Sequence, residues 1–174
     1  MQNSINWPED YLPGLTDNFC SNEVIISDLT SADIWKYIND TKYWEHYYSN
    51  VSDIQFYDNY KGSKLYNNAR FSFKTFGFLI EAKIIEYKEP QFGKAARISW
   101  HGWTGEHGTD KRLDVIHAWL IEDLDHSRVR VLTQESQKGK PALELARTLP
   151  NPMINGHQEW LNGLIHSAQT KLEL

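Results

Sequence analysis

Residues 114–139, DVIHAWLIEDLDHSRVRVLTQESQKG, read as two antiparallel strands joined by the polar turn DLDHS at 123–127. Side chains along a strand alternate between two faces, so a strand with one apolar face has that face buried. The hairpin therefore predicts a sheet with one buried face, and it puts a histidine and a glutamate on that face. The inward positions are Leu113, Val115, His117, Trp119 and Ile121 on the first strand and Val129, Val131, Thr133 and Glu135 on the second.

The same alternation runs back to about residue 51, broken by the turn sequences DNYKGS, EPQFGK and TGEHGTDK. It predicts further strands at 65–75, 78–86 and 94–100, each apolar on one face. A short strand at 22–27 comes earlier in the chain, and the first 20 residues read as an extended arm. The result is a run of antiparallel strands, because the turns between them are short.

Three helices are expected. LTSADIWKYIND offers Thr30 or Ser31 as the N-cap of a short amphipathic helix, and TKYWEHYYSN suits a second short helix packed beside it. After Pro150 and Pro152, apolar residues recur at helical spacing over 153–172. Burying one sheet face then requires laying this long helix across it, which predicts an α+β fold: a curved antiparallel sheet of about seven strands wrapped around a C-terminal helix, in one domain over 21–174.

Composition narrows the function classes. The chain has 174 residues, a formal net charge of -5 and scattered basic residues, which disfavours nucleic-acid binding. A single cysteine excludes an internal disulfide, and the N-terminus has neither a signal peptide nor an apolar run long enough for a membrane span. We therefore expect a cytoplasmic globular protein that binds no membrane.

The order of elements resembles the SRPBCC superfamily, which contains the helix-grip domains of START and polyketide cyclase/dehydrase type. The likeness covers roughly residues 20–172 and rests on SADIWKYINDTKYWEHYYSNV, on the hairpin FKTFGFLIEAKIIEYKEP, on ISWHGW, and on the final hairpin leading to NGHQEWLNGL. The resemblance implies a cavity between sheet and C-terminal helix for an apolar or aromatic small molecule, such as a lipid or polyketide. It implies no single chemistry, because function resides in sites rather than folds.

The most specific candidate site is the pair His117 and Glu135. Cross-strand pairing places His117 opposite or diagonal to Thr133 and Glu135. A histidine beside a carboxylate on an apolar wall is suited to general acid/base chemistry or to orienting a ligand carbonyl. The alternative is that Thr133 or Glu135 only satisfies the hydrogen bonds of a core histidine.

Other candidates depend on the cavity. The rings of Trp100, Trp119 and Phe71 face inward and are suited either to stacking on a flat ligand or to plain core packing. His157 and Trp160 lie on the apolar stripe of the last helix and would close the pocket from the other side.

Metal, nucleotide and thiol chemistry are not indicated. His101 and His107 lack a carboxylate or cysteine at a recognised metal-ligand spacing, and the glycine-rich turns do not open a helix after a strand. Cys20 has no nearby histidine in the sequence and is interpreted as structural. We therefore expect no metal and no cofactor.

Three functions remain open. The first is binding of an apolar small molecule, the second is a cyclase or dehydratase with His117 as acid/base and Glu135 tuning it, and the third is a protein-interaction domain. The aromatic N-terminal arm packs either on its own sheet or on that of a second copy in a homodimer.

Overall fold

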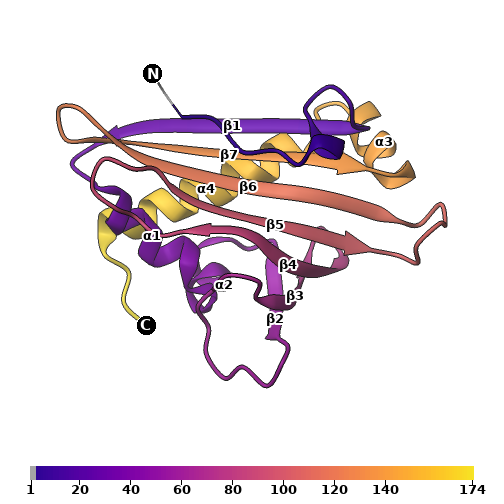
Figure 1. Cartoon of the computed structure of the whole chain (residues 1–174), viewed down its shortest axis with the longest axis horizontal. Coiled ribbons are helices and arrows are strands. Elements are labelled where there is room, and N and C mark those ends of the chain that lie inside the picture. Colours follow the sequence, from indigo (N-terminus) through magenta and orange to yellow (C-terminus); the bar gives the residue numbers. More distant parts are fainter. Residues whose placement is uncertain (1–2) are drawn as a thin grey trace.

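The computed structural model describes residues 3–174, and its elements follow the predicted order (Figure 1). A 3-10 turn η1 (Glu9–Tyr11) precedes the sheet, and a second, η2 (Thr41–Tyr43), lies between the first two helices. The strands are β1 (Asn18–Ser27), β2 (Val51–Phe56), β3 (Arg70–Thr75), β4 (Phe78–Lys88), β5 (Ala96–Thr104), β6 (Leu113–Leu124) and β7 (Arg128–Lys138). The helices are α1 (Ser31–Asn39), α2 (Trp44–Tyr47), α3 (Lys140–Arg147) and α4 (Pro152–Thr170).

Within residues 3–174 the strands form one antiparallel sheet in the order β1-β7-β6-β5-β4-β3-β2. Helix α4 runs along one face of the curved sheet. Helices α1 and α2 pack near the C-terminal end of α4 (Figure 1). The predicted helix-grip α+β fold is confirmed. No helix of residues 3–174 combines the length and apolarity needed to cross a membrane.

Two strand starts and one helix differ from the sequence prediction. β1 begins at Asn18 rather than at residue 22, because β7 extends far enough to pair with the additional residues. The strand expected at 65–75 begins only at Arg70, after a turn at residues 67–68. Helix α3 was not predicted, because Gly139, Pro141 and the later prolines read as a loop, although proline is well tolerated in the first turn of a helix.

Side-chain caps fix the starts of α1 and α4, and of the two caps only Thr30 was among the residues predicted. Thr30 is the N-cap of α1 and forms a capping box, in which the Thr30 side chain accepts from the Asp33 amide and the Asp33 carboxylate accepts from Thr30. Asn151 caps α4 by accepting from the Met153 amide. Both caps satisfy amide groups that a helix leaves unpaired at its start.

Strand β6 is buried on both faces, contrary to the one-sided pattern predicted. Its outward residues Ala118 and Leu120 are covered by Ile5 of the N-terminal arm, which also contacts Leu132. Arg130 donates to the Asn3 carbonyl, and the Asn3 side chain donates to Glu122. The arm therefore packs on its own sheet, and this contact fixes the outer face of the last hairpin.

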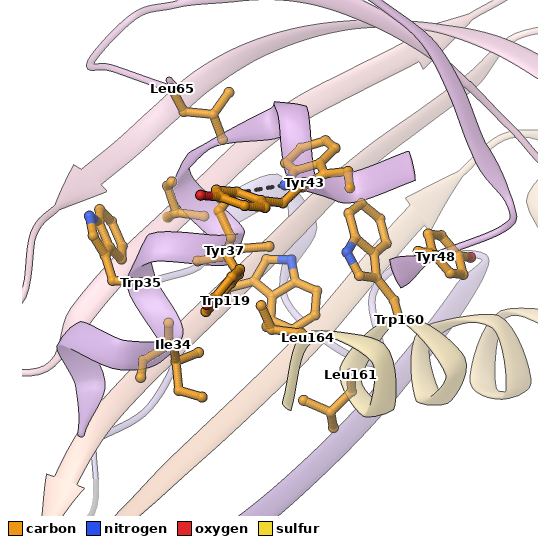
Figure 2. Packing of buried hydrophobic residues seen from close by; sticks show 14 of the residues in the cluster. Ile34, Trp35, Tyr37, Tyr43, Tyr48, Leu65, Trp119, Trp160, Leu161 and Leu164 are labelled. Carbon is orange, nitrogen blue, oxygen red and sulfur yellow. Dashed lines mark hydrogen bonds between the residues drawn. The ribbon is translucent and has the colours of Figure 1, made fainter. Parts of the chain in front are cut away.

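The inner face holds a core dominated by rings. Trp44 packs against Trp100, Trp160 and two phenylalanines of β3, and Tyr48 stacks on Trp160 with a centroid separation of 4.8 Å. Figure 2 shows Trp160 between Tyr48 and Trp119, with Leu161 and Leu164 on the same helix beneath them. These large side chains fill most of the space between the sheet and α4.

Candidate functional site

A buried polar cluster joins β1, β6, β7 and α4. The hairpin register places His117 opposite Glu135, and the Nδ1 atom of His117 lies 3.1 Å from the Oε2 atom of Glu135. From α4, the Nε2 atom of His157 lies 3.4 Å from the same oxygen. His117, Glu135 and His157 are 2%, 5% and 2% exposed, so these groups interact away from bulk solvent.

Each member of the cluster has a second polar partner. The His117 Nε2 atom lies 2.8 Å from the Thr133 hydroxyl, and the His157 Nδ1 atom lies 3.1 Å from the Cys20 sulfur. The Gln137 side-chain amide donates to Oε1 of Glu135. Both ring nitrogens of both histidines are therefore engaged, as expected for buried polar groups.

The hydrogen bonds continue from the carboxylate to the start of α4. Asn18 donates to the Gln137 side-chain oxygen at 2.6 Å, and Asn151, the N-cap of α4, donates to the Asn18 side-chain oxygen at 2.9 Å. A chain of amides thus links Glu135 to the end of the helix that carries His157. This link holds the helix in register with the sheet at the cluster.

The two histidines have opposite pKa shifts. Burial lowers the pKa of His157, but the Cys20 sulfur and the Glu135 carboxylate outweigh it, so the pKa rises to about 10. For His117, burial and the positive charge of His157 act together and hold the pKa well below its ordinary value. Within the pair, a proton is therefore favoured on His157 over His117.

The cluster forms one wall of a cavity of about 50 Å³ between the sheet and the first half of α4. His117, Glu135, Gln137 and His157 form the polar end of its lining, and Tyr48 and Thr75 add two hydroxyl-bearing side chains. The rest is mainly apolar and includes Phe73, Phe76, Phe78, Ile80, Trp100, Leu113, Val115, Leu145, Met153 and Trp160. The cavity is therefore an apolar pocket with a polar end.

Phe76 lies at this pocket in an unusual backbone conformation. It and Gly77 form the turn between β3 and β4 with φ angles of 49° and 78°, and the Phe76 amide donates to the Asn50 side chain. A bulky residue at positive φ is strained. Its ring rests on α4 at Gly156, where a Cβ atom would lie 2.2 Å from the ring.

The pocket contains some of the side chains expected from the sequence and not others. His117, Glu135, His157, Trp100 and Trp160 line it together. Phe71 does not, because it is stacked between Phe56 and Phe73 in the aromatic core. Trp119 and Thr133 also lie outside the lining: the Trp119 ring packs against His117 and Trp160, and Thr133 reaches the site only through its bond to His117.

Cys20 and Gln137 were missed as members of the cluster. Cys20 pairs with Glu135 in the β1–β7 register, and its histidine partner comes from a helix 137 residues later. The alternation of buried and exposed residues along β1 puts Cys20 on the inner face, but it does not reveal which helical residue lies above it. Gln137 lies two residues after Glu135 on the same face of β7, and this alternation could have identified it as a neighbour of the carboxylate.

The two histidines considered for zinc lie elsewhere. The His101 Nε2 atom lies 2.9 Å from the Asp114 carboxylate, which Arg112 also contacts, on the outer face of the sheet. His107 is exposed in the β5–β6 loop. Neither residue touches the pocket.

Comparisons with known proteins agree with this fold. No protein-family model and no curated protein matches the chain. A crystal structure of a hypothetical protein from Helicobacter pylori is 45% identical, covers 97% of this chain and 98% of its own, and superposes with a TM-score of 0.90. A Mesorhizobium loti protein (9% identity, 90% and 100% coverage, TM-score 0.63) and a START superfamily protein from Mycobacterium smegmatis (12% identity, 88% and 95% coverage, TM-score 0.54) share the fold.

Proposed function

We propose that this chain, which belongs to the same family as the Helicobacter pylori protein and has the helix-grip fold of the START superfamily, binds a small neutral molecule with an apolar or aromatic body and one polar group. The observation that carries the proposal is the apolar pocket that ends in His117, Glu135, Gln137 and His157. Pockets of this composition hold the apolar part of a ligand in the walls and orient it through a few polar groups.

The size of the cavity limits the ligand class. Its volume is about 50 Å³, whereas a cavity of about 150 Å³ holds benzene. A sterol or a long acyl chain is therefore a poor fit. A single aromatic ring fits once the Phe76 side chain swings away from Gly156 and so widens the pocket.

The charges of the cluster favour a neutral ligand. Glu135 is the one carboxylate among the pocket residues and already pairs with His157, so an ionised ligand would be buried without a counter-charge of its own. A neutral hydroxyl or carbonyl group, by contrast, needs only hydrogen-bond partners, which the Gln137 amide and the Glu135 carboxylate provide at the polar end. We infer a ligand such as a small phenol, alcohol or ketone.

Binding is favoured over proton transfer by the same contacts. Both nitrogens of His117 have partners within the protein, Thr133 and Glu135, so a substrate would have to displace one of them to exchange a proton with His117. The cyclase or dehydratase hypothesis requires a free base in the pocket. A ligand-binding role requires only the groups that line it.

A thermal-shift series with benzyl alcohol, toluene and benzoate, run with EDTA present, tests the proposal. Benzyl alcohol should raise Tm the most, because it alone combines a neutral ring with a hydroxyl. A ligand at a hundredfold excess over Kd stabilises the folded protein by about 2.7 kcal/mol. This corresponds to a rise in Tm of roughly 5–10 °C for a domain of this size.

Phe76→Ala should increase the affinity for benzyl alcohol, since it removes the ring that narrows the pocket. Phe92→Ala is the matched control, because Phe92 is fully exposed in the β4–β5 loop and should leave the affinity unchanged. If neither the wild-type chain nor Phe76→Ala responds to any of the three probes, the proposed function is wrong.

A further inference from the structure

Three side chains of the cluster present metal-ligand atoms to one point. One atom each from His117, Glu135 and His157 lie within 4.8 Å of one another. The two histidine nitrogens are 3.1 and 3.4 Å from the same carboxylate oxygen. Ligand atoms around a tetrahedral zinc ion, at 2.0–2.2 Å from the metal, are about 3.3 Å apart.

The outer contacts of these residues fix their orientation, as the second contacts of metal ligands do. A metal-bound histidine usually donates its second N–H to a fixed partner, which sets the tautomer and the orientation of the ring. His117 has Thr133 in that place, at 2.8 Å, and His157 has the Cys20 sulfur, at 3.1 Å. The Gln137 amide likewise fixes the carboxylate oxygen that does not face the histidines.

We propose that His117, Glu135 and His157 form a binding site for a divalent transition metal ion, for which Zn²⁺ is the natural probe. Two imidazoles and a carboxylate are a ligand set that suits Zn²⁺ and Fe²⁺ rather than Mg²⁺ or Ca²⁺. Sequence spacing does not predict this site, because its ligands lie on two strands and a helix at no recognised metal-ligand spacing. The proposal does not rest on the organic ligand proposed above.

The fourth coordination position faces the pocket. All three ligands line the cavity, and no other side chain of residues 3–174 supplies a further metal-ligating atom to the group. Sites with three protein ligands and one open position bind water or a substrate oxygen there. A metal at this point would therefore contact the polar group of any molecule in the apolar pocket.

Metal binding requires a small rearrangement. The His117 and His157 rings are stacked, with centroids 4.4 Å apart and planes inclined by 17°, so their nitrogens must tilt toward each other to reach one ion. The ion also replaces the protons that now join the imidazoles to Glu135. The partners of the second nitrogens, Thr133 and Cys20, act as pivots and remain in contact during this tilt.

Metal titration of the full-length chain tests the proposal directly. After removal of metals with EDTA and dialysis, the chain should bind about one Zn²⁺ in competition with a chromogenic chelator, and bound Co²⁺ should give the intense visible absorption of a low-symmetry site. Glu135→Gln should abolish this binding, and Thr133→Val should weaken it by about tenfold to a hundredfold. His101→Gln, which alters a histidine outside the cluster, should leave it unchanged.

A crystal of the zinc-treated wild-type chain gives a measurement that does not depend on the folding of a variant. An anomalous difference peak between His117, Glu135 and His157 is expected. The proposal is overturned if the chain retains no zinc, if the anomalous peak lies elsewhere, or if folded Glu135→Gln or Thr133→Val binds zinc like the wild type. Failure of the benzyl alcohol series in EDTA would leave these results untouched, so the two proposals fail separately.

Discussion

Replacing the Cys20 thiol is the sharpest stability test of the buried cluster. The sulfur is 2% exposed and lies 3.1 Å from the Nδ1 atom of His157. Cys20→Ala leaves that nitrogen buried without a partner, whereas Cys20→Ser keeps a polar atom at nearly the same place. The two variants therefore separate the hydrogen bond from the packing of the side chain.

The expected magnitude follows from the burial. An unsatisfied buried donor costs about 1–3 kcal/mol, and the small void left by the sulfur adds to this. Cys20→Ala should therefore lower the free energy of unfolding by about 2–3 kcal/mol, or Tm by roughly 4–12 °C. Cys20→Ser should lose clearly less, because the nitrogen remains paired.

Urea unfolding followed by circular dichroism in EDTA measures the difference, with Ser21→Ala as the control. Ser21 is exposed on the opposite face of β1, so this change should fall within about 0.5 kcal/mol of the wild type. Equal losses for the alanine and serine variants would mean that the sulfur contributes only packing. No loss for Cys20→Ala would mean that His157 is not held from this side at all.

Three further predictions concern the arm, the helix and acid stability. Ile5→Ala should destabilise by about 2 kcal/mol, measured by urea unfolding, because Ile5 covers Ala118 and Leu120; an unchanged midpoint would show that the arm does not hold this face. Gly163→Ala should destabilise by about 1–3 kcal/mol, because its Cβ would meet the Tyr47 carbonyl oxygen at 2.1 Å, whereas Gly156→Ala should cost less, since only the movable Phe76 ring is in the way; the reverse order of Tm values would contradict this. Burial raises the pKa of Glu122, but the hydrogen bonds from Asn3 and Arg130 lower it by more, so the pKa lies below its ordinary value. The stability that it provides is present above the unfolded pKa and is lost as the pH falls through the folded value; Glu122→Gln should therefore reduce stability at pH 7 and flatten its decline on acidification, and a decline as steep as that of the wild type would refute the assignment.

The sheet was predictable because one rule determines it. A strand buried on one face must alternate, and a shift of one residue would expose every apolar side chain, so parity alone put His117, Thr133 and Glu135 on the inner face. The register then followed from the short turn, and His117 lies opposite Glu135 as one of the two expected alternatives. The Thr30 cap of α1 was predictable for a similar reason, since it is a local contact.

Contacts between distant elements were not predictable in this way. The bond between Cys20 and His157 depends on the rotation of α4 about its axis and on its position along the sheet, which helical periodicity leaves open. The burial of both faces of β6 depends on the arm, whose residues have no regular period. Phe71 and Trp119 show the same limit: parity places them inward, but only packing decides whether an inward ring lines a cavity or fills it.

Which aromatic rings fill the core and which line the cavity determines what ligands the pocket selects. Trp44, Trp100 and Trp160 occupy the middle of the space between sheet and helix, so the remaining cavity lies at the end nearest α3, where Phe76 is part of its wall. Its apolar walls would accept many small rings with similar affinity, because apolar contact is not directional. Discrimination must then come from the polar end, where an unmatched group is costly to bury. Substitutions at Glu135 or His157 should therefore change which molecules bind, while substitutions at Phe76 should change how large they are.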